Sequence, residues 1–169
     1  MTILEIKTFP DKFLTRPTKP VNNIDGSLQD LIDRMAQTMY EAPGIGLAAI
    51  QVGIDKSLVV YDISPREEGH SFGVLVNPVI TAVEGSIVSE NEGCLSVPDF
   101  TSDVKRHRAI EVEGIDRHGN PVKFQAEGLM AIMLQHEIDH LEGKLFIDRI
   151  SKLKRELYIR RIRKNLKNP

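Results

Sequence analysis

The sequence predicts an α+β fold in which antiparallel β-sheets surround a central buried helix. Three observations favour this class. Strand-like segments follow one another through the middle of the chain, without the strand–helix alternation that builds a parallel sheet. A largely apolar helical segment, 128–143, comes after them. An N-terminal amphipathic helix and a C-terminal basic helix complete the predicted elements.

Length and composition place this fold in one domain, 1–169. A chain of 169 residues suits a single hydrophobic core. Its hydrophobic content of 41% and charged content of 27% are typical of globular proteins and argue against disorder. The longest apolar run, Leu129 to Leu134, is too short to cross a bilayer, and the N-terminus lacks a signal-peptide pattern. We therefore expect a cytoplasmic protein with no membrane partner.

The first predicted helix covers 26–41. Its apolar residues recur every three or four positions and so share one face: Ile24, Leu28, Leu31, Ile32, Met35 and Met39. Pro43 and Gly44 end this helix. The segment 44–53 that follows has too many glycines for a helix, and we expect it to be extended and to face a ligand.

The middle of the chain is predicted to be rich in strands. The expected strands are 57–62, 72–77 and 79–84, followed by a hairpin of 109–116 and 120–127. The segment 92–98 contains glycine and proline, and we expect it to be a loop. His70, His107 and His118 fall in loops or on the outside of the β-region, so they are expected at the surface.

The last two predicted helices differ in character. The helix 128–143 is apolar all round in its first part, which predicts burial, and Gly143 is expected to end it. Ser151 is expected to cap the last helix. The segment 151–169 has eight lysines and arginines and one glutamate, a net charge of +7, while residues 1–150 carry −9. A basic tail on an acidic body indicates a polyanionic partner.

The strongest motif is His136-Glu137-Ile138-Asp139-His140, within the predicted buried helix. Residues i and i+4 of a helix lie on one face, about 6 Å apart along the axis, so the two imidazoles can bind one metal ion. Glu137 then lies beside the ion and can take a proton from bound water. The alternative is two surface histidines on an exposed helix. A buried helix must satisfy its polar side chains, however, and metal coordination does so.

Three positions are candidates for the third metal ligand. One metalloprotease class adds a histidine downstream, but Phe146 stands at that position. Another class uses a downstream glutamate, and Glu156, the candidate beyond the motif's helix, lies in the basic tail. Cys94 is the better candidate, although a lone cysteine is more often a small buried hydrophobe. Two imidazoles and one thiolate leave a fourth position for water, which is typical of a catalytic site.

Three motifs carry a resemblance to a known family. They are Gly44-Ile45-Gly46-Leu47-Ala48-Ala49-Ile50-Gln51, Glu92-Gly93-Cys94-Leu95-Ser96 and Gln135-His136-Glu137-Ile138-Asp139-His140. In this order they resemble the motifs of peptide deformylases, and the resemblance covers nearly the whole chain. It implies a single catalytic domain that removes the formyl group from N-formylmethionyl nascent polypeptides and releases formate.

The resemblance also implies a role for each site residue. Cys94, His136 and His140 hold the metal, and Glu137 is the general base and acid. The side chain of Gln51 and the backbone N–H next to the cysteine stabilise the oxyanion. That second donor belongs to Leu95. Such donors are chemically reasonable because negative charge forms on the formyl oxygen during attack. The family implies one divalent ion, Fe2+ in the cell, with Zn2+, Ni2+ or Co2+ possible in purified protein.

Further residues are expected to contact the substrate. They are Gly44, Ile45, Gly46, Ile132 and Met133. Gly46 lets a peptide backbone come close. The three apolar residues suit the unbranched methionine side chain, although ordinary core packing explains each of them equally well. Separately, Arg106 is expected to pair with Asp139 and to fix its loop against the metal-binding helix.

Three other functions fit parts of the sequence. GIGLAA matches the dinucleotide-binding pattern G-x-G-x-x-A, with Asp62 as the ribose-binding acid, but these glycines follow a helix rather than a strand. A different metallopeptidase would share the histidine motif but would not release formate from a formylated peptide. The basic segment 151–169 suits nucleic acid, and the resemblance implies contact with ribosomal RNA. We expect the protein to be a monomer.

Overall fold

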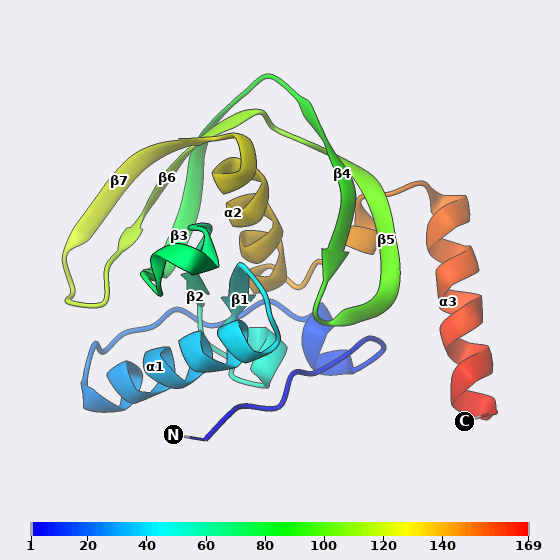
Figure 1. Ribbon diagram of the computed structural model, residues 1–169, viewed down its shortest axis with the longest axis horizontal. Helices are drawn as coiled ribbons and strands as arrows, with labels where there is room; N and C mark the ends of the chain where they lie inside the picture. Colours follow the sequence, from blue (N-terminus) through cyan, green and yellow to red (C-terminus); the bar gives the residue numbers. More distant parts are fainter. Residues whose placement is uncertain (1, 169) are drawn as a thin grey trace.

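Helix α2 (Gly128–Leu141) lies between two antiparallel sheets, as Figure 1 shows for the computed structural model, which describes residues 2–168. The larger sheet has the order β1-β2-β3-β6-β7, and the smaller one pairs β4 with β5. The strands are β1 (Gly46–Ala48), β2 (Leu58–Tyr61), β3 (Gly73–Glu84), β4 (Ile87–Cys94), β5 (Val97–Arg106), β6 (Ala109–Ile115) and β7 (Pro121–Glu127). Because every strand pairing is antiparallel, the predicted α+β class is confirmed.

Helix α1 (Gly26–Glu41) covers one part of the larger sheet with the face that its periodicity predicts. Its buried apolar residues include Leu28, Ile32, Met35 and Met39, which pack with residues of β1, β2 and β3. The Asp25 side chain accepts a hydrogen bond of 2.9 Å from the Leu28 N–H and caps the first turn. This packing brings the end of α1 next to the segment that begins at Gly44.

The segment after α1 is buried and only partly extended. Strand β1 is the expected extended part, but Ala49–Val52 form a short 3₁₀ helix, η2, so the prediction of an extended segment over all of 44–53 was wrong. Gly53, with φ of 77°, ends this helix in the left-handed conformation that favours glycine. Strand β1 is an edge strand of the larger sheet, so one side of its backbone is available to a further strand.

Two predictions in the β-region were also wrong. The expected loop 92–98 is the end of β4, a two-residue turn and the start of β5. Pairing between these strands has register shifts near Asn91, which has φ of 50°. The expected strands 72–77 and 79–84 are one strand, β3, which continues through Pro78 with a register shift against β6. The predicted hairpin of β6 and β7 is confirmed.

Helix α2 is buried over most of its length. Its interior contacts include Leu75, Ile110 and Val112 of the larger sheet. Leu129 is 53% exposed, so the expectation that the first turn is buried was wrong for this residue. Gly143, with φ of 77°, follows the last turn as predicted.

Helix α3 (Lys152–Lys167) extends along the outside of the smaller sheet (Figure 1). The Ser151 hydroxyl accepts a hydrogen bond of 3.2 Å from the Lys154 N–H, as expected for its cap. Leucines do not hold this helix in place, since Leu153, Leu157 and Leu166 are exposed. Tyr158 is buried instead, with its ring centroid 4.6 Å from that of Phe100. None of the helices in 2–168 is long and apolar enough to span a membrane.

Candidate active site

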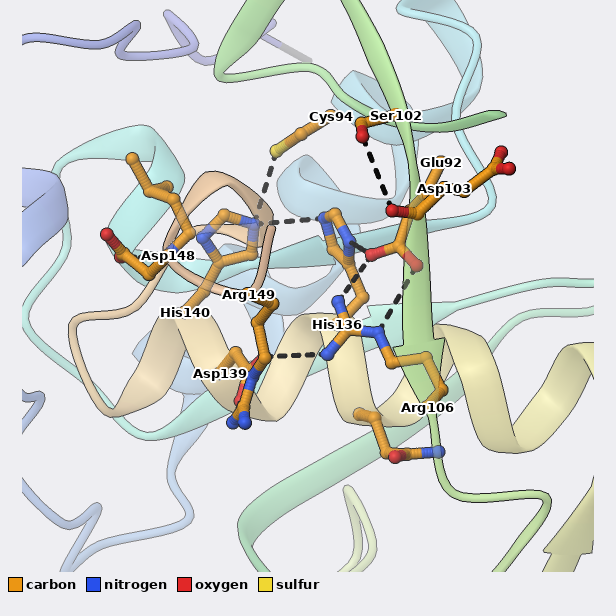
Figure 2. Close-up of polar contacts among 12 residues, drawn as sticks. Glu92, Cys94, Ser102, Asp103, Arg106, His136, Asp139, His140, Asp148 and Arg149 are labelled. Carbon is orange, nitrogen blue, oxygen red and sulfur yellow. Dashed lines mark hydrogen bonds and ion pairs between the residues drawn. The ribbon is translucent and has the colours of Figure 1, made fainter. Parts of the chain in front are cut away.

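Three metal-binding side chains converge between α2 and the end of β4. Cys94 is the last residue of β4, and His136 and His140 lie one turn apart on α2. Cys94 Sγ is 3.3 Å from His140 Nε2, which is 3.2 Å from His136 Nε2. Figure 2 shows these three side chains pointing toward one another. Their ligand atoms all lie within 4.8 Å of one another, as expected for a single metal ion.

The chemistry of these donors fits a divalent cation. His136 Nδ1 lies 2.8 Å from the carboxylate of Glu92, which fixes the ring so that its Nε2 faces His140. Burial, together with the nearby charge of His136, lowers the pKa of His140 well below its ordinary value. His140 is therefore neutral and keeps a lone pair. The two Nε2 atoms and the Cys94 sulfur therefore converge on a point where one divalent cation can be bound.

A buried network of charged side chains lies behind His136 and includes Asp139 of the same helix. Arg106 donates to both Glu92 and Asp139, with 2.8 Å between Arg106 Nη1 and Asp139 Oδ2. The predicted pair of Arg106 with Asp139 is therefore confirmed. Arg149 donates to both oxygens of Asp139, at 2.7 and 2.9 Å. Figure 2 shows the whole chain from Glu92 to Arg149 along one side of α2.

The roles of Glu92 and Arg149 were missed at the level of sequence. Glu92 belongs to the second motif and is 8% exposed, so it is a buried carboxylate. Burial by itself would raise the pKa of Glu92, but hydrogen bonds from His136 and Arg106 outweigh it and lower the pKa to about 2. The ionised carboxylate then holds the His136 ring in one orientation. The position of Glu92 in the same motif as Cys94 was the sequence feature that could have indicated its role.

Glu137 lies beside the metal ligands and faces the same cleft. It is 4% exposed, and burial raises the pKa of its carboxyl to about 7. Within the described residues, its Oε2 atom has no hydrogen-bond partner. A buried carboxyl with this pKa and a free oxygen can both accept and release a proton near neutral pH.

Gln51 is fixed in place by hydrogen bonds from both ends of its amide. Its Oε1 accepts from the Ala48 N–H at 2.9 Å, and its Nε2 donates to Ser96 Oγ at 3.1 Å. The same Nε2 lies 3.7 Å from Cys94 Sγ. Ser96 was not singled out from the sequence. It is fully buried, and its backbone N–H donates to Cys94 Sγ at 3.4 Å.

A cleft of about 670 Å³ connects these groups to the surface. The five residues expected near substrate all line it: Gly44, Ile45, Gly46, Ile132 and Met133. Ile45 and Leu129 are 41% and 53% exposed at this cleft, whereas Met133 is buried. An apolar cleft with a few polar groups at its base is typical of a site for a small organic group.

The other candidates from the sequence supply no further metal donor near Cys94, His136 and His140. Glu156 is exposed on α3, and Phe146 is buried with its ring centroid 6.3 Å from that of His136. His70, His107 and His118 are exposed as predicted. The glycines of the dinucleotide pattern belong to β1 and the residues before it, with no phosphate-binding helix after them.

Comparison with known proteins identifies the family. A family model described as polypeptide deformylase matches residues 3–156. The chain belongs to this family. A peptide deformylase from Desulfosudis oleivorans is 56% identical over 167 residues, which are 99% of this chain and 96% of that protein. The peptide deformylase from Thermodesulfovibrio yellowstonii is also 56% identical, over 94% of this chain and 95% of its own length.

Solved structures of this family share the fold. A peptide deformylase from Legionella pneumophila has a TM-score of 0.90 and 44% identity, and covers 98% of this chain and 96% of its own. One from Synechococcus elongatus, in complex with actinonin, has a TM-score of 0.88 and 42% identity over 94% of this chain and 86% of its own. The protein is therefore a metal-binding hydrolase with peptide deformylase activity, which removes the N-formyl group from nascent peptides.

Replacing Glu92 by Gln tests the support of His136. We expect the free energy of unfolding to fall by about 3 kcal/mol, because buried Arg106 loses one of its two counter-charges. Metal affinity should fall roughly tenfold to a hundredfold, because an ionised partner no longer orients His136. Urea unfolding and titration with a competing chelator measure the two effects. Glu90→Gln, at an exposed position on the same strand, is the matched control, and equal values for the two variants would contradict this role.

Proposed function

We propose that formyl hydrolysis takes place at the base of the cleft, between Glu137 and the Cys94, His136 and His140 donors. One observation carries this proposal: Glu137, whose Oε2 has no hydrogen-bond partner among the described residues, lines the same cleft as Cys94 and His136. Cys94, His136 and His140 would hold one divalent ion. When bound, this ion supplies Lewis acidity, which lowers the pKa of water and polarises the formyl group.

Glu137 moves the proton in this mechanism. Its carboxylate accepts a proton from the attacking water and returns it to the nitrogen of the leaving peptide. A pKa of about 7, raised by burial, suits both transfers because the group is neither a strong acid nor fully protonated near neutral pH. Gly46 leaves the space that this side chain occupies, since a Cβ there would lie 2.7 Å from Glu137 Oε1.

Gln51 and Leu95 stabilise the charge that forms on the formyl oxygen. Ser96 and the Ala48 N–H orient the Gln51 amide before substrate arrives, so little reorganisation is needed during reaction. Leu95 follows Cys94 directly, in the turn between β4 and β5, where it lines the cleft. By comparison with other oxyanion holes, each donor lowers the free energy of the transition state by roughly 3 kcal/mol.

The substrate is an extended formylated peptide in this proposal. Ile45, Ile132 and Met133 form an apolar wall for the methionine side chain. Gly44 and Gly46, at the start of the edge strand β1, let the peptide backbone come close, and Gly93 of β4 lines the same cleft. Backbone pairing with an edge strand depends little on side chains, so it suits an enzyme that acts on many nascent chains. Residues 1–169 form one catalytic domain in this account.

Two variants distinguish the role of Glu137 as the base from the role of Cys94 as a metal ligand. Glu137→Ala, and its closer analogue Glu137→Gln, should keep the metal and lose at least about a hundredfold in kcat, because proton transfer is lost. Cys94→Ala should lose the metal. Elemental analysis and formate release from formyl-Met-Ala-Ser measure both effects. The opposite pattern, with metal lost from Glu137 variants and kept in Cys94→Ala, would reverse the assigned roles.

The working metal is proposed to be Fe2+ in the cell. A site of one thiolate and two imidazoles also suits Zn2+, and accepts Ni2+ or Co2+, so affinity alone does not select the ion. We expect protein purified without oxygen to contain iron and to show its highest kcat with Fe2+. Elemental analysis with activity measured per bound metal tests this. Highest activity per metal with Zn2+ would contradict it.

The basic helix α3 is proposed to contact ribosomal RNA where nascent chains emerge, in the cytoplasm, with the enzyme acting as a monomer. Most of its lysines and arginines are exposed. Arg155 and Arg161 help Tyr158 to anchor the helix, through Asp148 and the Asp99 carbonyl, and the other basic residues point outward. Phosphate contacts made by such a helix would depend on salt. Contact with the ribosome would place the cleft near formylated N-termini.

Charge neutralisation tests this contact without removing the anchor. Arg160, Arg163, Lys164 and Lys167 are all exposed, and replacing them by Gln should abolish ribosome co-sedimentation at low salt. Turnover of formyl-Met-Ala-Ser should not change. A matched control replaces exposed lysines elsewhere: Lys12, Lys19, Lys56 and Lys105. Equal co-sedimentation of both variants and the wild type would refute the contact.

A further inference from the structure

The segment Gly44–Gly46 forms one wall of the cleft and touches the proposed catalytic groups at both ends. A Cβ on Gly44 would lie 2.9 Å from Leu95 Cδ1, and a Cβ on Gly46 would lie 2.7 Å from Glu137 Oε1. Both distances are shorter than van der Waals contact. The backbone of this wall therefore lies directly against the residues assigned to the oxyanion and to proton transfer. A small shift of the wall would change the space left for the substrate.

A surface loop, 62–71, holds this wall from the side away from the cleft. The Asp62 N–H donates to the Ile45 carbonyl at 2.9 Å. Arg66, in the short 3₁₀ helix η3 (Arg66–Glu68), donates from Nη2 to the Gly44 carbonyl. Figure 1 shows this green loop beside the cyan end of α1, where the wall begins. Two consecutive carbonyls of the wall are thus bound by one loop.

Asp62 organises the loop as a buried carboxylate. Its side chain is 1% exposed and accepts hydrogen bonds from the Ser64 N–H at 2.9 Å and the Ser71 N–H at 3.0 Å. The Tyr40 hydroxyl donates to it at 2.5 Å. Burial alone would raise the pKa of Asp62, but hydrogen bonds from Ser64 and Tyr40 outweigh it and lower the pKa below its ordinary value. Asp62 is therefore ionised and attracts Arg66, whose Nη1 lies 3.7 Å away.

Tyr40 ties the loop to the last turn of α1. Its ring stacks on that of His70, with centroids 3.8 Å apart and an interplanar angle of 7°. The Arg66 guanidinium also lies over this ring, with Cζ 4.7 Å from the centroid. Arg66 thus has three partners: the Gly44 carbonyl, the Asp62 carboxylate and the Tyr40 ring. An arginine held at three points loses little further side-chain freedom when substrate binds, so it can fix a backbone carbonyl.

We propose that Arg66, oriented by Asp62 and Tyr40, is a positioning residue that sets the place of Gly44–Gly46 for the peptide substrate. The inference rests on the proposed function, because it assumes that the peptide lies along this wall. Arg66 acts through the backbone of the wall and touches no reacting atom. Its loss therefore affects the binding of a peptide that extends along β1 more than the chemical step. A substrate that ends just after methionine should be affected less.

The test compares Arg66→Ala with Arg108→Ala. Arg108 is a matched control because it is also a partly exposed arginine in an ion pair, 2.9 Å from Glu84, but it makes no hydrogen bond to Gly44–Gly46. For formyl-Met-Ala-Ser we expect kcat/KM of Arg66→Ala to fall about tenfold, mostly through KM, and about threefold or less for formyl-methionine amide. Arg66→Lys should recover part of the loss, because it keeps one donor for the Gly44 carbonyl. Melting temperature and metal content are measured for every variant.

Two results would overturn the proposal. One is an Arg66→Ala protein with the KM of Arg108→Ala. The other is an equal loss for both substrates that follows a lower melting temperature or metal content, which indicates a structural role alone. If Arg66→Ala does not fold, Tyr40→Phe tests the proposal instead. This variant lacks the hydroxyl that donates to Asp62, and it should raise KM for the longer substrate about threefold. Formate release by the wild-type protein tests the activity itself, so failure of the positioning role is distinguishable from failure of the proposed function.

Discussion

Two imidazole nitrogens 3.2 Å apart, with a thiol sulfur 3.3 Å from one of them, are the contact on which the rest of this structure depends. A cation bound between these atoms would replace the hydrogen bonds that they can otherwise share. The helical spacing of His136 and His140 places both rings on one side of α2. The smaller sheet then brings Cys94 to the same point from the end of β4. A metal ion held by these three side chains would therefore link α2 to the smaller sheet.

The orientation of the His136 ring depends on charged side chains in the protein interior. Glu92, Arg106 and Asp139 are all at least nine-tenths buried, and removing such groups from water is unfavourable by several kcal/mol each. Their mutual contacts offset much of this, but hydrophobic residues of the same size would serve stability equally well. The arrangement is better explained by function. An ionised Glu92 keeps the Nδ1 side of His136 turned away from Cys94 and His140, so that Nε2 would be the atom that binds a metal ion.

Much of the site was predictable from sequence, because its strongest signals are local. The four-residue spacing of the histidines needs only a helix, and a lone cysteine in a protein with that motif has few other roles. The order of the three motifs then suggested the family. What sequence could not show was the partner of each buried charge. The pairing of Arg106 with Asp139 was expected, but Glu92 and Arg149 complete the network from strands and turns distant along the chain.

The fold was harder to predict where tertiary contacts override local propensity. Strand β4 contains Glu90, Asn91 and Gly93, which do not favour strands, and it exists because β5 pairs with it beside the cleft. Likewise, Leu129 is exposed in an apolar helix because it lies at the cleft rather than in the core. In both places the departure from the expected pattern lies at the cleft, where residues need not satisfy core packing.

X-ray absorption of the protein loaded with Zn2+ tests the central claim most directly, because it counts the atoms that bind the ion. The account predicts one sulfur at about 2.3 Å and two imidazole nitrogens at about 2.0–2.1 Å, with a lighter atom completing the shell. A shell without sulfur, or one with a single imidazole, would show that Cys94, His136 and His140 do not grip the same ion.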